Sequence, residues 1–123
     1  MSFEIPLFMP GGLVSGTDLS AAAKQFTAVI MTTTDDTVIA ATDGVKAFGI
    51  VQNTPAVGEE ASVLMAGLSK LVAGTGGLTA GDKWTPETST GGGVVAGTGD
   101  EVCGTVVNGA AAGGIATVSI GLD

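Results

Sequence analysis

Short runs of alternating apolar and polar residues, rich in Val, Ile and Thr, recur along the whole chain. Alternation with a period of two is typical of strands that bury one face. The runs that predict strands cover residues 25–33, 37–42, 45–52, 61–67, 68–74, 83–85, 94–98, 101–107 and 115–122. Turn signals such as Asp43-Gly44 separate them, and no helix of ordinary length is expected. The pattern therefore predicts an all-β fold, a small barrel or sandwich of short antiparallel strands.

Residues 18–26 fit either one to two helical turns, with Asp18 as the N-cap, or the lead-in to the first strand. The 17 residues before them contain Pro6, Pro10 and Gly11-Gly12, which favour an extended arm ahead of a single β domain of residues 18–123. The arm is too apolar to be left in water, so it covers its own core, a sister subunit or a larger partner. Its candidate contact residues are Phe3, Ile5, Leu7, Phe8 and Met9.

The chain contains an internal sequence repeat. The sequence GIVQNTPAVGEEASV at residues 49–63 returns 55 positions later as GTVVNGAAAGGIATV at residues 104–118. The identical positions of the first copy are Gly49, Val51, Asn53, Ala56, Gly58, Ala61 and Val63. Each copy reads as strand, turn and strand, so we expect a β-hairpin used twice, within repeat units of about residues 46–68 and 101–123.

The matched polar positions of the repeat have a backbone explanation. Asn bonds its own backbone in turns, and Gly supplies the positive φ that a Cβ would strain. On the strands, the face shared by both copies is expected to be core, whereas the other face is where the copies specialise. The first copy alone carries Pro55, Glu59, Glu60 and Leu64, and these are candidates for contact with a neighbouring molecule.

Trp84 is the one large aromatic residue outside four Phe, because the chain has no Tyr. Two interpretations remain open for it. It either fills the core at the end of a barrel or anchors a subunit interface, where Trp is enriched.

Charge excludes one class of partner. Twelve acidic residues against four Lys and no Arg give a net charge of −8. A nucleic-acid-binding protein needs a basic stripe for the phosphates, so neither DNA nor RNA is expected as a direct partner. The N-terminus lacks the basic region of a signal peptide, and no apolar run is long enough to span a membrane. We expect synthesis in the cytoplasm without export and no membrane partner.

Candidate chemistry is sparse. There is no His, and Cys103 stands alone in a strand-like run, which favours a buried structural thiol and leaves zinc without ligands. Asp35, Asp36 and Asp43 do not have the spacing of a calcium loop. The stretch around Gly81 and Lys83 lacks the order of a phosphate-binding loop. Lys70, as a modified carrier lysine, is a weak alternative because it lies in a strand. The sequence predicts no catalytic, metal or cofactor site.

The stretch from Gly49 to Trp84 resembles the capsid cement (head decoration) proteins of tailed bacteriophages. The similar features are Gly49-Ile50, Gln52-Asn53, Pro55-Ala56 and Gly58-Glu59, followed by a Val-rich strand, a Gly67–Lys70 step and an Ala80–Asp82 step. Upstream, residues 18–29 are similar to the opening of that family, so the resemblance covers roughly residues 15–123. The arm before Gly12 and the segment PETSTGGG at residues 86–93, expected to be a surface loop, have no counterpart in it.

The resemblance implies a structural virion protein, commonly a homotrimer, that binds major capsid proteins on the outer surface of the shell and stabilises it. An acidic chain without Arg suits a site away from packaged DNA. The alternatives are another virion component, such as a tail part, a fibre or a glycan-binding β-module, and an enzyme or carrier domain.

Overall fold

The computed structural model describes residues 5–8 and 11–121, and it contains strands and one short 3₁₀ turn. The strands are β1 (Ile5–Phe8), β2 (Val14–Ser15), β3 (Ala28–Met31), β4 (Thr37–Ala40), β5 (Gly49–Val51), β6 (Val63–Leu64), β7 (Ala66–Val72), β8 (Lys83–Pro86), β9 (Gly93–Val95), β10 (Gly104–Asn108) and β11 (Ile115–Ile120). The 3₁₀ turn η1 covers Ala22–Lys24. The predicted all-β fold is confirmed.

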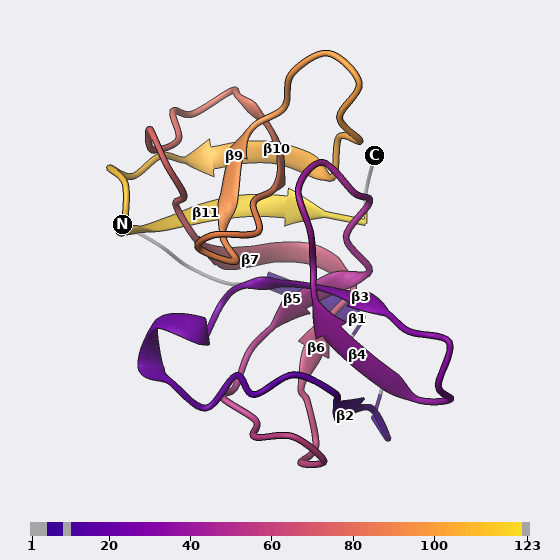
Figure 1. Cartoon of the computed structure of the whole chain (residues 1–123). Helices are drawn as coiled ribbons and strands as arrows, with labels where there is room; N and C mark the ends of the chain where they lie inside the picture. The colour runs from indigo at the N-terminus through magenta and orange to yellow at the C-terminus, as the bar shows by residue number, and fades with distance from the viewer. Residues whose placement is uncertain (1–4, 9–10, 122–123) are drawn as a thin grey trace.

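The strands form two sheets, one in each of two lobes that lie one above the other (Figure 1). Lobe 1, residues 13–64, holds the sheet β2-β4-β3-β5-β6. Lobe 2, residues 66–121, holds β7-β11-β10-β8-β9, and β1 adds a sixth strand to this sheet beside β7. Both sheets are curled. A bridge between Val14 and Glu60 joins the two ends of the sheet in lobe 1, and a bridge between Ala73, which follows β7, and Gly93 of β9 closes lobe 2. Because β2 lies in the sheet of lobe 1, the body of the protein begins before residue 18.

The lobes are copies of one another well beyond the repeat seen in the sequence. In lobe 1 the β3–β4 pairs are Val29 with Ala40, Ile30 with Ile39 and Met31 with Val38. In lobe 2 the β8–β9 pairs are Trp84 with Val95, Thr85 with Val94 and Pro86 with Gly93, each shifted by 55 residues. The pair Val51 with Val63 likewise returns as Val106 with Val118. The sequence repeat therefore belongs to a duplication of the entire lobe.

The turn of the repeat keeps its geometry in both copies. The N–H of Glu59 donates to the carbonyl of Ala56 at 3.0 Å, and that of Gly114 donates to Ala111 at 2.9 Å. Gly58 and Gly113 have φ of 84° and 85°, the value that the third position of a type II turn requires. The prediction that these glycines are turn formers is confirmed.

A lead-in strand also repeats, with a shift of 58. Leu13–Thr17 reads LVSGT and residues 71–75 read LVAGT. Ser15 exchanges hydrogen bonds with Gly58 and Glu59, and Ala73 does so with Gly113 and Gly114, at 2.8–2.9 Å. The two pentapeptides therefore hold the two repeat turns in the same way.

The copies differ where the lead-in strand meets the start of β4 in lobe 1 and the segment before β9 in lobe 2, a contact that we call the seam. In lobe 1 the N–H of Val14 donates to the carbonyl of Asp36 at 2.8 Å, which closes the seam internally. In lobe 2 the equivalent N–H of Val72 donates to Phe26 of lobe 1 at 2.9 Å, and the N–H of Ala28 donates to Gly91 at 2.9 Å. Residues 26–28 of lobe 1 are thus inserted into the seam of lobe 2, and we call them the wedge.

Two groups of buried side chains form the core. The smaller lies within lobe 1 and includes Val29, Val38, Val51 and Val63. The larger fills lobe 2 around Trp84 and extends into lobe 1 through the buried residues Ala28, Ala41, Ala47, Ile50 and Leu64. Apolar contact between the lobes is therefore continuous with the core of lobe 2, so the two lobes pack as one body.

Segment 86–93 connects β8 to β9. Thr88 and Ser89 at its tip are exposed, as expected of a surface loop, whereas its last three residues are buried. Gly91, Gly92 and Gly93 are buried, and a Cβ on Gly91 would lie 3.1 Å from the side chain of Thr27. Thr88 and Asp43 exchange hydrogen bonds, from Asp43 N to Thr88 Oγ1 at 2.9 Å and from Thr88 N to Asp43 Oδ1 at 2.6 Å. Gly91 therefore allows the segment to lie this close to lobe 1.

The close approach of β10 to β11 gives a test of the register between these two strands. A Cβ on Gly104 would overlap the carbonyl of Ser119, whereas one on Gly113 would have open space and face only the cost of a positive φ. We expect Gly104→Ala to lower the free energy of unfolding by about 3 kcal/mol and Gly113→Ala by about 1 kcal/mol. Urea unfolding followed by Trp84 fluorescence measures both, and equal costs would contradict the assigned register.

Thr85 presents a second test, because its hydroxyl is buried and has no hydrogen-bond partner within residues 5–8 and 11–121. Replacing it with Val removes an unpaired polar atom at nearly constant volume, so Thr85→Val should stabilise the protein by about 1 kcal/mol. Thr27 is the matched control: it is equally buried, but its Oγ1 donates to Lys24 O at 2.7 Å. Thr27→Val should destabilise by a similar amount, and loss of stability in both variants would contradict the assignment.

Candidate interaction surfaces

Three of the predicted contact residues are buried inside the chain. Leu64 and Trp84 are 1% and 0% exposed, and Pro55 is also buried. Leu64 lies in the core between the lobes, because lobe 2 covers the face of the repeat that was expected to be outer. These positions correct the expectation that Pro55 and Leu64 are presented to a partner, and for Trp84 they decide against the interface interpretation.

Trp84 fills the core of lobe 2, the first of its two interpretations. It stands in the sheet where lobe 1 has Val29, and its indole Nε1 donates to the carbonyl of Ser119 at 3.0 Å. Burying an indole with its N–H satisfied contributes strongly to stability, and loss of such a side chain costs about 3–5 kcal/mol.

The two predicted glutamates lie in an exposed turn at the far end of lobe 1. Glu59 accepts a hydrogen bond from Ala56 N at 2.8 Å through Oε1. Asn53 spans the turn, donating to Glu60 O at 2.9 Å and accepting from Ser62 N at 3.0 Å. Asn53 therefore fixes the turn through the backbone, as predicted, and leaves the side chain of Glu60 in solvent.

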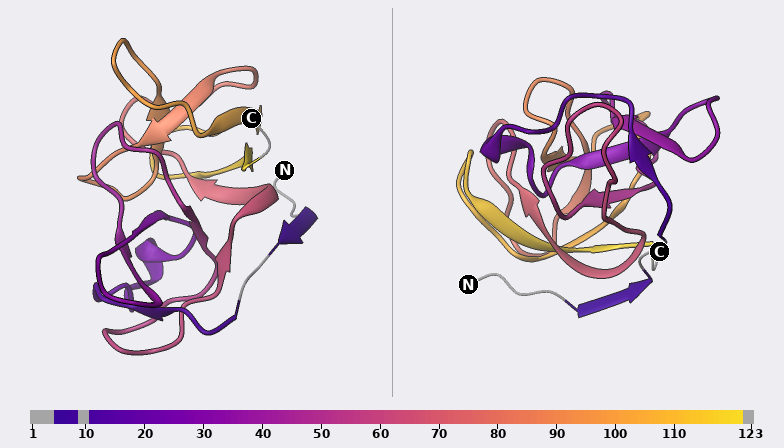
Figure 2. Two further views of the ribbon diagram at one scale, coloured as in Figure 1. Left: turned by 90° about the vertical axis from the view of Figure 1, so that its right-hand side faces the viewer. Right: turned by 90° about the horizontal axis from the view of Figure 1, so that it is seen from below.

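The N-terminal segment lies against its own chain. β1 pairs antiparallel with the start of β7, Ile5 with Leu68 and Pro6 with Gly67, and it forms the outer edge of the sheet of lobe 2 (Figure 2). Phe3 and Met9 fall outside the described residues. The main-chain pairing of β1 establishes an intramolecular contact and leaves contact of the arm with a partner as a proposal.

Cys103 is buried and hydrogen-bonded. Its Sγ accepts from Ala47 N at 3.3 Å, which makes it part of the contact between the lobes. Burial raises the pKa of the thiol, opposed by this hydrogen bond and by the charge of Lys46. Both observations agree with the predicted structural role.

No group of three or more His, Cys, Asp or Glu within residues 5–8 and 11–121 is placed to hold a metal ion. Nor does any helical segment in the described part of the chain have the length and apolar character needed to cross a bilayer.

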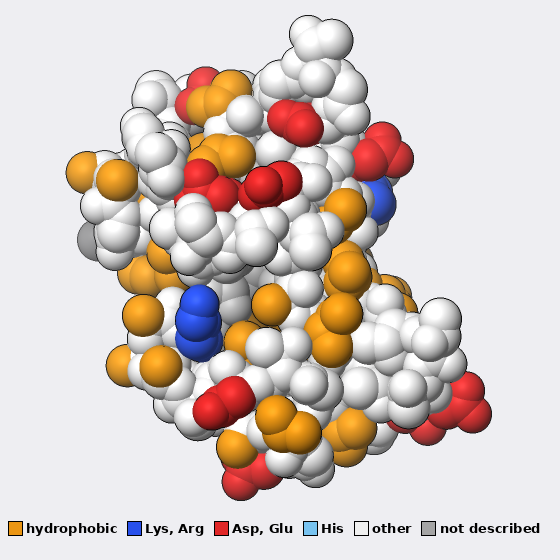
Figure 3. All heavy atoms as spheres, viewed as in Figure 1, with side chains coloured by type: hydrophobic (Ala, Val, Ile, Leu, Met, Phe, Trp, Pro, Cys, Tyr) orange, Lys and Arg blue, Asp and Glu red, His pale blue; other side chains and the backbone are white. Residues whose placement is uncertain are grey.

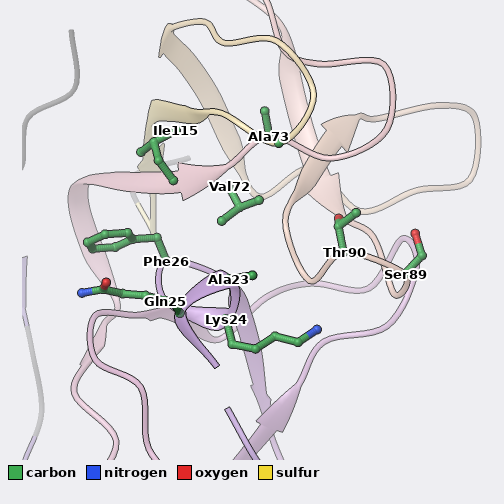
Figure 4. Close-up of a pocket in the computed structure, with 11 residues that line it drawn as sticks. Ala23, Lys24, Gln25, Phe26, Val72, Ala73, Ser89, Thr90 and Ile115 are labelled. Carbon is green, nitrogen blue, oxygen red and sulfur yellow. The ribbon is translucent and has the colours of Figure 1, made fainter. Parts of the chain in front are cut away.

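Apolar side chains gather along the waist between the lobes, where the surface is hollowed (Figure 3). One groove there, of about 640 Å³, is formed by η1 and Phe26 of lobe 1 and by Val72, Thr90 and Ile115 of lobe 2 (Figure 4). A second hollow, of about 670 Å³, includes Met31, Phe48 and Met65. The sequence did not predict either hollow, because each is formed by residues of both lobes. The repeated pentapeptides LVSGT and LVAGT were the signal in the sequence that could have indicated two lobes.

No protein-family model and no curated protein matches this sequence. Among solved structures, the fold is similar to the N base of the head fiber gp8.5 of bacteriophage phi29. The TM-score is 0.72 at 17% sequence identity, and the match covers 92% of this chain and 94% of that chain. The similarity therefore extends over both lobes and establishes the fold.

The buried thiol gives a prediction of reactivity. Only the thiolate attacks thiol reagents, and the raised pKa of Cys103 keeps that form scarce at pH 8. The thiol of the native protein should be modified at least about tenfold more slowly than that of the unfolded chain. The rate of modification should increase as the pH rises. A Thr98→Cys variant, whose added thiol lies in an exposed loop, is the control and should react at the unfolded rate. Equally fast modification of Cys103 in the native wild type would contradict its burial.

Proposed function

We propose that this protein is a structural component of a tailed-phage virion that binds the outer surface of the capsid and stabilises the shell. The observation that carries the proposal is the match of nearly the whole chain to the base of a phage head fiber. The resemblance to capsid cement proteins, which rests on the residue pattern of the sequence and not on the fold, supports the same class of role.

The chemistry of the surface is compatible with this role. The net charge of −8 disfavours contact with packaged DNA and suits the solvent-facing side of a shell. The proposed partners are the major capsid protein and further copies of the chain, with a trimer favoured by the resemblance. No catalytic step, nucleic acid or membrane enters the proposal, and the apolar N-terminal arm is proposed to add to attachment.

A second candidate is the base of a capsid-bound fibre. The same structural match favours it, because the similar structure is the N base of a head fiber. The two candidates differ in what the protein does after attachment. A cement protein braces its neighbours, whereas a fibre base carries a further structure outward.

The test uses expanded shells that lack the protein. Adding purified protein should give saturable binding, and a cement role requires a higher rupture temperature of the decorated shell. Shells already carrying the protein are the control and should bind no more. Binding without a change in rupture temperature would favour the fibre base, and hundreds of copies per virion would favour cement over a tail part. No binding to shells would overturn both candidates.

A further inference from the structure

The groove at η1 exists because the lobes are joined asymmetrically. Its floor contains Phe26, from the wedge, together with Val72 and Ile115 of lobe 2 (Figure 4). Lobe 1 closes its own seam through Val14 and Asp36, so the same inserted floor is not built there. The groove is therefore a product of the duplication that neither lobe would have alone.

Phe26 holds a backbone conformation that is unfavourable for its side chain. Its φ is 63°, and the equivalent residue of lobe 2 is Gly81, with φ of 93°. The N–H groups of both bond the equivalent carbonyls, of Val51 at 2.9 Å and of Val106 at 2.8 Å. A strained aromatic residue where the sister lobe has Gly indicates a requirement for the ring itself, and strain of this kind gathers at functional sites.

Lys24 borders the groove with its ammonium group unpaired among the described residues (Figure 4). The other three lysines are engaged: Lys46 donates to Val102 O at 2.8 Å, Lys83 donates to Thr105 Oγ1 at 2.8 Å, and Lys70 lies 5.4 Å from the centre of the Phe26 ring. A free cation beside an apolar floor suits an apolar side chain that is flanked by a carboxylate.

The exposed turn of lobe 1 carries that combination. Val57 is 64% exposed, the most of any large apolar side chain among the described residues, and the Glu60 carboxylate beside it has no partner there. Lobe 2 has Ala112 and Ile115 at the equivalent positions, so these features belong to the first copy of the repeat alone.

We propose that copies of this chain associate head to tail, with the turn at Val57–Glu60 of one copy seated in the groove at Phe26 of the next. Val57 lies on the apolar floor, and the carboxylate of Glu60 pairs with Lys24. The turn is at the far end of lobe 1 and the groove is at the waist, so a second copy has to supply the turn (Figure 1). Contacts of this type close into a ring when the rotation allows and otherwise extend into a filament.

The net charge of −8 makes two copies repel each other. This repulsion acts over a longer distance than the attraction between Lys24 and Glu60 of the next copy. At physiological salt, interactions between exposed charges are screened beyond about 8 Å. Screening therefore weakens the repulsion between the two acidic copies more than the attraction between Lys24 and Glu60, which are in contact and partly desolvated in the groove. Association should therefore be stronger at physiological salt than at low salt. The inference does not depend on capsid binding.

Sedimentation velocity of the purified full chain over a range of concentrations tests the proposal. The wild type should self-associate, and Val57→Asp or Lys24→Glu should each weaken association at least tenfold, by placing a charge on the apolar floor or repelling Glu60. The double variant Lys24→Glu with Glu60→Lys should restore association to near the wild-type level, because it reverses the pair.

Val95→Asp is the matched control, since Val95 is 53% exposed and does not line the groove. It should associate like the wild type, and circular dichroism with thermal melting confirms that each variant is folded. A wild type that stays monomeric at all concentrations would overturn the proposal. So would association that survives both single variants, or a double variant that fails to recover although it is folded.

Discussion

The insertion of residues 26–28 into the seam of lobe 2 is the interaction on which the rest of the structure depends. Val72 and Gly91 hold buried or half-buried backbone groups that must be paired, and lobe 1 provides their partners. In lobe 1 the equivalent groups of Val14 and Asp36 satisfy one another. Lobe 2 is thus completed by lobe 1, which makes the two lobes cooperative and fixes the groove between them.

The duplication also shows how one backbone accommodates two different cores. Trp84 occupies the position of Val29, and its sheet neighbourhood has Gly93 where lobe 1 has Val38. A Cβ on Gly93 would lie 2.6 Å from Leu71 Cδ2 and 3.1 Å from the indole ring of Trp84, so the packing around the large residue favours the small one. The combined volume of Trp84 and Gly93 is roughly that of Val29 and Val38, and only its division between the two positions differs. Cores tolerate such volume-conserving exchanges best.

The sequence predicted the strand-rich fold and the repeat turn, because both rest on local chemistry. It did not reveal the full duplication, since residues 28–40 and 83–95 share only the Thr33/Thr88 identity while keeping the same pairing. The assignment of Leu64 to an outer face failed for a related reason. Period-two alternation assumes a sheet with one wet face, whereas the packing of lobe 2 on lobe 1 buries both faces of the repeat at that point. Contacts between lobes cannot be read from either lobe alone.

The same comparison explains where a duplicated structural protein acquires contact surfaces. The turn of lobe 2 borders the groove through Gly113 and carries Ala112 and Gly114 where lobe 1 has larger side chains. The turn of lobe 1 has no second lobe beside it and carries Val57, Glu59 and Glu60 instead. The side chains that differ between the two turns are not needed for the turn itself, since Gly58 and Gly113 give both turns the same geometry. Side chains that differ on an identical backbone reflect the different surroundings of the two turns, and for the turn of lobe 1 we propose that a second copy of the chain provides them.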